Sequence, residues 1–230
     1  GSNINRLFEL IKKYPDCKFS TIVDSEIIID SVDLHASKNK TSLSVFLDVN
    51  NGMNRTGVTP DNKAIDLYMK IESKKSLIAN GLHVYDGHIR HSNFDLRKNE
   101  CDRDFKKVEK LIKNLKNLNV HVKNVVAGGT PTFPIHSKRK NVQVSPGTPL
   151  LWDERYGGMF KDLDFSPAAV LFGRLVSKPQ SNLLCFNLGH KSVAAEMEFP
   201  RLKFLNCSDT NQIGQSEEHL VVECLDSDKY

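Results

Sequence analysis

Four short segments carry the residue types best suited to chemistry, and each directly follows an apolar run. They are NNGMNRTG (50–57), YDGHIRH (85–91), GGTPT (128–132) and SPGT (145–148). The last two combine glycine with threonine, so that closely spaced backbone N–H groups and a hydroxyl can donate to the oxygens of an anion. We therefore expect a phosphate site there, although glycines after strands also commonly serve only to form turns.

The first two segments supply side chains for binding and proton transfer. Arg55 lies between two glycines, where its guanidinium is either solvated in a turn or directed at a phenolate or carboxylate oxygen. Tyr85, His88 and His91 fall within seven residues, and histidine transfers protons readily near neutral pH. The histidines without any partner pattern are expected at the surface: His35, His121, His136 and His219.

Composition places the chain among ordinary globular proteins and excludes several function classes. Of its 230 residues, 39% are hydrophobic and 26% are charged, and the net charge of +4 is spread along the chain, which does not favour nucleic-acid binding. No run approaches the ~18 apolar residues that a membrane span needs. Five cysteines without a C-x-x-C spacing predict reduced thiols in a cytoplasmic protein, and no spacing predicts a metal site.

The elements that must position these segments alternate between helix and strand up to about residue 150. Apolar periodicity predicts a helix over residues 3–13, and Asp24-Ser25 and Thr59-Pro60 predict the starts of two more, the second reaching Glu72. A longer amphipathic helix is predicted over residues 98–118. Strands are predicted over residues 18–23, 43–49, 80–86, 122–127 and 142–145. This α/β alternation predicts a parallel sheet whose polar loops meet at its carboxyl edge.

The sequence changes character near residue 150. Short β-rich runs are separated by glycine, proline, asparagine and serine, at residues 167–177, 183–188, 192–198, 202–205 and 219–224. This pattern is typical of a small antiparallel sheet. We therefore expect two domains, one of residues 1–150 and one of residues 151–230.

Taken together, these segments resemble the fold-type III pyridoxal-phosphate (PLP) enzymes, and among them the D-threonine aldolase/D-serine dehydratase-like group. The matching stretches follow the family's order: DVNNGMNRTGV (48–58), GLHVYDGHIRH (81–91), VAGGTPTFP (126–134), VSPGTPLLWD (144–153) and LGHKSVAAE (188–196). The resemblance implies part of an alanine-racemase-like β/α barrel that binds PLP, followed by part of an antiparallel β domain. It also implies a homodimer and a small D-3-hydroxy amino acid as substrate, such as D-threonine or D-serine.

The resemblance assigns roles at individual positions. Arg55 matches the arginine at the PLP ring oxygen, Tyr85 a tyrosine at the phosphate, and His91 the histidine that handles the substrate's β-hydroxyl proton. The family's phosphate-binding loops match Gly129, Thr130, Gly147 and Thr148. The position that faces the pyridine nitrogen matches Ser145. These roles imply a lyase that either breaks the Cα–Cβ bond or expels the hydroxyl as water.

The chain departs from the family at two points. No lysine in it fills the role of the family's Schiff-base lysine, and the C-terminal metal motif is missing. We therefore expect the 230 residues alone to be inactive as an aldolase, and the ligands of any divalent metal in a longer parent protein to lie outside this chain. Lys191 belongs to a different motif and is interpreted as structural or related to dimer formation.

Three other functions remain open. They are an amino-acid racemase of the same fold, a PLP-binding protein without turnover, and an unrelated barrel that binds a phosphorylated sugar. The loop with His88 and His91 favours a lyase over a racemase. The β-rich segment after residue 150 disfavours a PLP carrier, since such carriers consist of the barrel alone.

Overall fold

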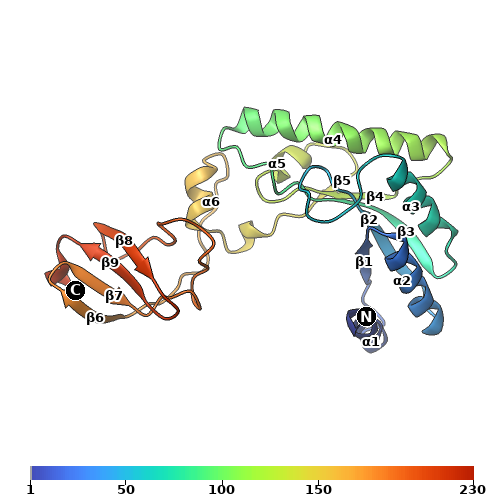
Figure 1. Cartoon of the computed structure of the whole chain (residues 1–230). Coiled ribbons are helices and arrows are strands. Elements are labelled where there is room, and N and C mark those ends of the chain that lie inside the picture. Colours follow the sequence, from blue (N-terminus) through green and yellow to red (C-terminus); the bar gives the residue numbers. More distant parts are fainter. Residues whose placement is uncertain (1) are drawn as a thin grey trace. The chain divides into compact units, whose positions relative to one another are not determined.

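The computed structural model describes residues 2–230 and divides them into two compact units (Figure 1). Unit 1 extends to Pro149 and also includes Phe160–Asp162, whereas unit 2 comprises Leu150–Met159 and Leu163–Tyr230. Among the described residues, no helix is both long and apolar enough to cross a membrane. The five cysteines are free thiols, and Cys101, Cys207 and Cys224 are buried.

Unit 1 alternates helices and strands over its whole length. Its elements are α1 (Ser2–Lys13), β1 (Ser20–Val23), α2 (Glu26–Lys38), β2 (Leu43–Asp48), α3 (Asn62–Ser73), β3 (Leu77–Val84), α4 (Phe94–Asn117), β4 (Asn124–Ala127), α5 (Phe133–His136) and β5 (Val142–Val144). A short 3₁₀ turn, η1 (Thr148–Leu150), follows β5.

The strands form one parallel sheet in the sequential order β1-β2-β3-β4-β5. Sequential order with right-handed helical crossovers places successive helices on the same face, as in a β/α barrel, whereas a doubly wound sheet reverses its order. The predicted parallel sheet is therefore confirmed, and all of its carboxyl ends lie at one edge.

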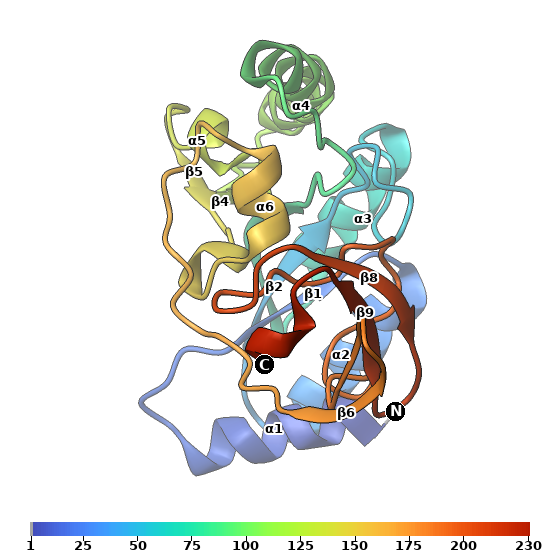
Figure 2. The ribbon, with the colours of Figure 1, turned by 90° about the vertical axis from the view of Figure 1, so that its left-hand side faces the viewer.

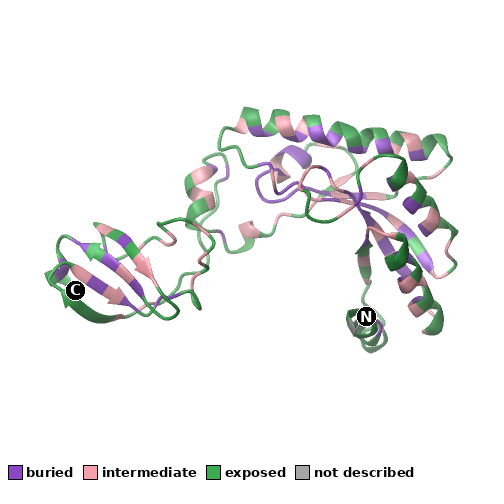
Figure 3. Ribbon diagram, in the orientation of Figure 1, coloured by how far each residue is buried: buried purple, intermediate pink, exposed green. Residues whose placement is uncertain are grey.

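The core of unit 1 fills the space between the sheet and its helices. Buried residues follow the strands in Figure 3, and in β2 they alternate as Leu43, Val45 and Leu47. From the helix side, α4 contributes a stripe of buried apolar residues at helical spacing: Phe105, Val108, Leu111 and Leu115. Each of these side chains adds roughly 1.5–3 kcal/mol on burial, so the core fixes the strand ends from which the polar loops depart.

Two helix starts differ from the prediction because side-chain caps decide them. The helix expected to begin after Thr59 begins at Asn62, since the Asp61 carboxylate accepts the backbone N–H of Lys63 at 2.9 Å. The Thr59 hydroxyl donates instead to Asp61 at 2.6 Å. The long helix begins at Phe94 rather than residue 98, because Asn93 caps it.

Unit 2 is built on one antiparallel sheet, as predicted, but with different strands. Its elements are α6 (Glu154–Met159), β6 (Leu175–Gln180), β7 (Leu183–Phe186), β8 (Thr210–Gln215), β9 (Leu220–Cys224) and η2 (Ser227–Lys229), and the sheet order is β6-β7-β9-β8. Figure 2 shows β6, β8 and β9 curving around one another. The strands expected over residues 192–198 and 202–205 are absent from the described chain, and β8 takes the place beside β9.

Candidate functional site

The loops after β2, β3 and β4 meet at the ring of Tyr85. The guanidinium carbon of Arg55 lies 4.8 Å from the centre of that ring, which is a cation–π geometry. On the other loop, a Cβ built on Gly129 would lie 3.0 Å from the same ring. Glycine at this position therefore lets the backbone of the loop after β4 approach the tyrosine closely.

The loops after β4 and β5 are joined by hydrogen bonds. The backbone N–H of Thr148 donates to the Thr130 hydroxyl at 3.1 Å, and the Ser145 hydroxyl donates to the carbonyl of Gly128 at 3.0 Å. Thr130 is buried, whereas Gly147 faces open space, because a Cβ built on it would meet no atom within 4 Å. The loops after β2, β3, β4 and β5, which carry every predicted site residue, thus form one connected group.

Asp48, the last residue of β2, links the Arg55 loop to β3. It is buried and pairs with His83 Nδ1 at 2.7 Å. Burial acts to raise the pKa of Asp48, but hydrogen bonds from His83 and Thr56, with the charges of His83 and Arg55, outweigh it. The pKa therefore lies below its ordinary value of 3.8. The carboxylate stays ionised at neutral pH and attracts the guanidinium of Arg55.

The depressed pKa of Asp48 predicts an acid-dependent stability. Because the folded pKa is below the unfolded one, the stabilisation is complete above the unfolded pKa and is lost as the pH falls through the folded pKa. The free energy of unfolding of the wild type, measured with urea, should therefore be lower at about pH 3 than at about pH 5. In the Asp48→Asn variant the free energy of unfolding should differ less between the two pH values. An equal difference in variant and wild type would contradict the pairing of Asp48 with His83.

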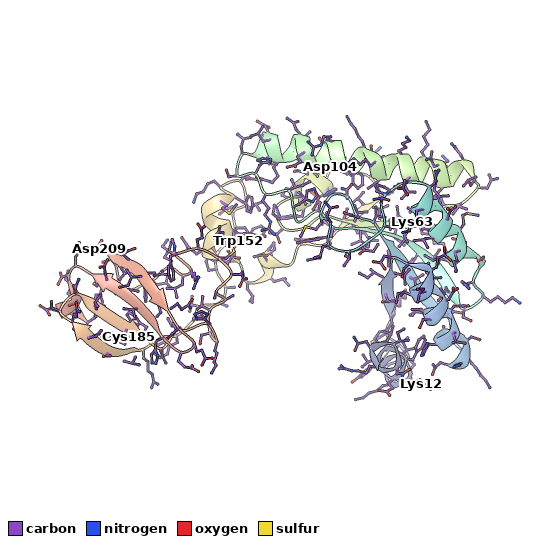
Figure 4. The ribbon with its side chains drawn as sticks, in the orientation of Figure 1. Lys12, Lys63, Asp104, Trp152, Cys185 and Asp209 are labelled. Atoms are coloured by element: carbon purple, nitrogen blue, oxygen red, sulfur yellow. The ribbon has the colours of Figure 1, made fainter. Side chains whose placement is uncertain are left out.

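The two histidines of the loop after β3 occupy different environments. His91 Nε2 lies 3.1 Å from Glu100, and 54% of the His91 side chain is exposed. His88 Nε2 lies 3.4 Å from the buried carboxylate of Asp104 on α4, labelled in Figure 4. Within the described part of the chain, His88 Nδ1 is buried without a hydrogen-bond partner. The polar partners of both histidines thus lie on α4. The His88 ring also packs against Gly52 in the Arg55 loop, where a Cβ would lie 2.6 Å from its Nε2.

A buried cluster centred on Asp86, the neighbour of Tyr85, was not predicted from the sequence. His136 Nε2 lies 2.8 Å from Asp86 Oδ2, and Cys101 Sγ lies 3.3 Å from His136 Nε2. Each residue of the cluster is no more than 1% exposed. The expected surface position of His136 is therefore wrong: its ring packs edge-on against Phe105, with 5.1 Å between ring centres.

Arg97 was also missed, because it lies in a strongly charged helix that suggests exposure. Its side chain is fully buried and donates to the carbonyls of His91 at 2.7 Å, Ser92 at 3.2 Å and Pro131 at 2.9 Å. It also forms an ion pair with Asp162. One guanidinium thus ties the loop after β3 to the loop after β4.

Comparisons with known proteins agree with this arrangement. The family model "Alanine racemase, N-terminal domain" matches residues 7–153. The 3-hydroxy-D-aspartate aldolase of Paracoccus denitrificans (strain Pd 1222) is 23% identical over 240 residues, which cover 98% of this chain and 59% of that protein.

Solved structures share the fold. D-threonine aldolase from Filomicrobium marinum superposes with a TM-score of 0.86 at 21% identity, covering 96% of this chain and 60% of that one. D-threo-3-hydroxyaspartate dehydratase from Delftia sp. HT23 gives a TM-score of 0.77 at 16% identity, covering 97% and 63%. The chain thus spans about three fifths of the length of these relatives.

Proposed function

The chain belongs to the alanine racemase N-terminal domain family, and from this membership we propose that it is the cofactor-binding portion of a PLP-dependent lyase. Its substrates are D-3-hydroxy amino acids such as D-threonine or D-serine. The observation that carries the proposal is the meeting of Arg55 and Gly129 at Tyr85, beside the joined loops of Thr130 and Thr148. The three similar proteins described above are named as two aldolases and a dehydratase, which supports a lyase. Alanine racemases also match this chain, so the racemase is kept as an alternative.

The residues present fit PLP. Backbone N–H groups and hydroxyls along Gly129-Thr130 and Gly147-Thr148 are suited to a phosphate, and the open space at Gly147 leaves room for it. Arg55 would hold the ring oxygen and Tyr85 would lie at the phosphate. Ser145, which already donates to Gly128, would face the pyridine nitrogen.

When bound, PLP supplies an electron sink for the carbanion that forms at the substrate's Cα. The protein's part is orientation and proton transfer. Arg55 keeps the ring oxygen in a fixed direction, and the ionised Asp48 holds the Arg55 loop at the end of β2. His91 takes the proton from the substrate's β-hydroxyl in the aldolase reaction, with Glu100 beside its Nε2 to stabilise the charged ring.

The remaining assignments are part of the same proposal. Residues 1–150 act as the PLP-binding part of the barrel and residues 151–230 as part of the C-terminal β domain, in a cytoplasmic homodimer. In unit 2, Lys191 pairs with Glu218 at 2.7 Å, which supports a structural role for it. A divalent metal in the parent protein would take its ligands from outside this chain. The alternatives are a racemase of the same fold and a PLP-binding protein without turnover.

The test is a calorimetric titration of the 230-residue chain with PLP. We expect reversible binding that sodium borohydride does not convert into a covalent adduct, because the loops at the carboxyl edge of the sheet contain no lysine. The Arg55→Ala variant should bind PLP about 10- to 100-fold more weakly, since it loses a charge-assisted hydrogen bond. No glycine or aldehyde should be released from D-threonine.

The matched control is Arg6→Ala on α1, which removes the same charge from an exposed position. It should bind PLP as the wild type does. Equal affinity of the Arg55→Ala variant and the wild type would contradict the assigned site, and release of aldehyde by the isolated chain would contradict its expected inactivity.

A further inference from the structure

The carboxylate of Asp86 holds the loop after β4 through one of its oxygens. Oδ1 accepts the Thr132 hydroxyl at 2.6 Å and the backbone N–H of Gly129 at 3.0 Å. A Cβ on Gly128 would lie 2.8 Å from the His136 ring and 3.0 Å from the Thr132 hydroxyl, so glycine is required for this close approach. The conformation of residues 128–132 therefore depends on Asp86.

The other oxygen, Oδ2, faces His136, and the neighbours of that ring determine which nitrogen carries the proton. Arg139 Nε lies 3.3 Å from His136 Nδ1. Because a guanidinium has only donors, Nδ1 must be the acceptor and the proton of the neutral ring lies on Nε2. Nε2 is 2.8 Å from Asp86 Oδ2, so His136 donates to the carboxylate.

Cys101 completes the cluster as a protonated thiol. Burial, and after it the charge of Asp86, raises the pKa of Cys101 to about 12. Asp, Cys and His are common metal ligands, and the three ligand atoms lie within 4.8 Å of one another. A cation would have to displace the protons of Nε2 and of the thiol. The contacts among Asp86, Cys101 and His136 are those of a hydrogen-bonded cluster.

We propose that Asp86 is a positioning residue for the cofactor phosphate: it fixes the loop of residues 128–132 so that the donors of Gly129-Thr130 are preorganised before the phosphate arrives. This inference rests on the proposed function. Preorganisation strengthens binding because the loop does not have to be ordered when the ligand binds. Asp86 itself is buried, and its two oxygens are occupied by Gly129, Thr132 and His136.

The Asp86→Asn variant tests this role because its expected effect has a definite sign. The N–H₂ group of the asparagine amide would face either the two donors on the Oδ1 side, Thr132 and Gly129, or the Nε2–H of His136. In either orientation a donor faces a donor, and at least one hydrogen bond is lost. We expect affinity for PLP to fall about 10- to 100-fold, with affinity for pyridoxal, which has no phosphate, nearly unchanged. If Asp86 acted only through its charge, removal of that charge would strengthen phosphate binding.

A double variant should restore binding. In Arg139→Gln the amide group takes the place of Nε and can accept as well as donate, so His136 can move its proton to Nδ1. His136 Nε2 then accepts from the amide of the introduced asparagine. We therefore expect the Asp86→Asn/Arg139→Gln double variant to recover much of the PLP affinity. The Arg139→Gln variant alone should bind PLP with about the affinity of the wild type. Recovery of this kind would not follow from general structural damage.

Calorimetry with PLP, pyridoxal and inorganic phosphate separates the outcomes. A wild type that does not bind PLP contradicts both proposals, whereas equal PLP-to-pyridoxal selectivity in a folded Asp86→Asn variant overturns only the role of Asp86. If that variant does not fold, Thr132→Val with Thr132→Ser as its control replaces it, and unchanged selectivity of Thr132→Val also overturns the role. A stoichiometric zinc ion that is lost in Cys101→Ala would overturn the proton assignment.

Discussion

The Arg97→Ala variant should lose about 3–5 kcal/mol of unfolding free energy, because it removes a fully buried guanidinium that donates to several backbone carbonyls. Arg97 is fully buried, and its removal would leave the carbonyls of His91, Ser92 and Pro131 without their donor and Asp162 without its partner. Urea unfolding followed by far-UV circular dichroism measures this loss. The helices α1–α5 that dominate this signal lie in unit 1.

Two further variants identify the cause. Arg103→Ala removes an arginine from the same helix, but 66% of that side chain is exposed, so the cost should be about 0–1 kcal/mol. Arg97→Lys keeps the charge but lacks the planar guanidinium with its several N–H donors. Its free energy of unfolding should therefore lie between those of the wild type and Arg97→Ala. Similar losses in Arg97→Ala and Arg103→Ala would contradict the inferred role. The single tryptophan, Trp152, lies in unit 2 and reports separately on that unit.

The meeting of the polar loops could be predicted because parallel strands end at one edge of a sheet. Once the apolar runs before Arg55, Tyr85 and Gly129 are interpreted as neighbouring parallel strands, their loops have to lie together. The contact between the Arg55 guanidinium and the Tyr85 ring was not predicted, because it depends on how the side chains pack within those loops. The identity of the cofactor rests on the resemblance of the motifs and stays a proposal.

The Asp86 cluster could not be predicted because its members are far apart in the chain. His136 lies 50 residues after Asp86 and Cys101 lies 15 residues after it, and no periodic pattern connects them. Arg97 was missed for a related reason. Its burial is decided by the carbonyls of two loops and not by the composition of α4.

The strands of unit 2 show the weakness of pattern alone in short antiparallel elements. The segment Thr210–Gln215 has little apolar character, yet it pairs with β9 along its whole length. The more apolar residues 202–205 form no strand. A strand needs a partner, and the choice of partner depends on the other strands of the sheet.

The Gly81→Ala variant should be among the most destabilised single substitutions in unit 1. Gly81 lies in β3 at a φ of +144°, beside a shift in the register between β2 and β3. A Cβ there would lie 1.9 Å from the carbonyl oxygen of Asn124, its partner in β4. Since backbone atoms cannot rotate away as a side chain can, β3 and β4 would have to separate. We expect a loss of about 3 kcal/mol or more.

The matched control is Gly214→Ala, also within a strand. A Cβ at Gly214 in β8 would meet no atom within 4 Å, so this variant should change stability by less than about 1 kcal/mol. Thermal unfolding of both variants measures the contrast. Amide exchange at Val126 and Gly128, whose N–H groups face β3, shows whether β4 has come away from β3; the Gly128 N–H donates to the carbonyl of Val84 at 2.9 Å. A Gly81→Ala variant as stable as Gly214→Ala, with those amides still protected, would contradict the tight pairing of β3 with β4. Because Gly128 and Gly129 directly follow β4, weakened PLP binding should accompany any separation of the two strands.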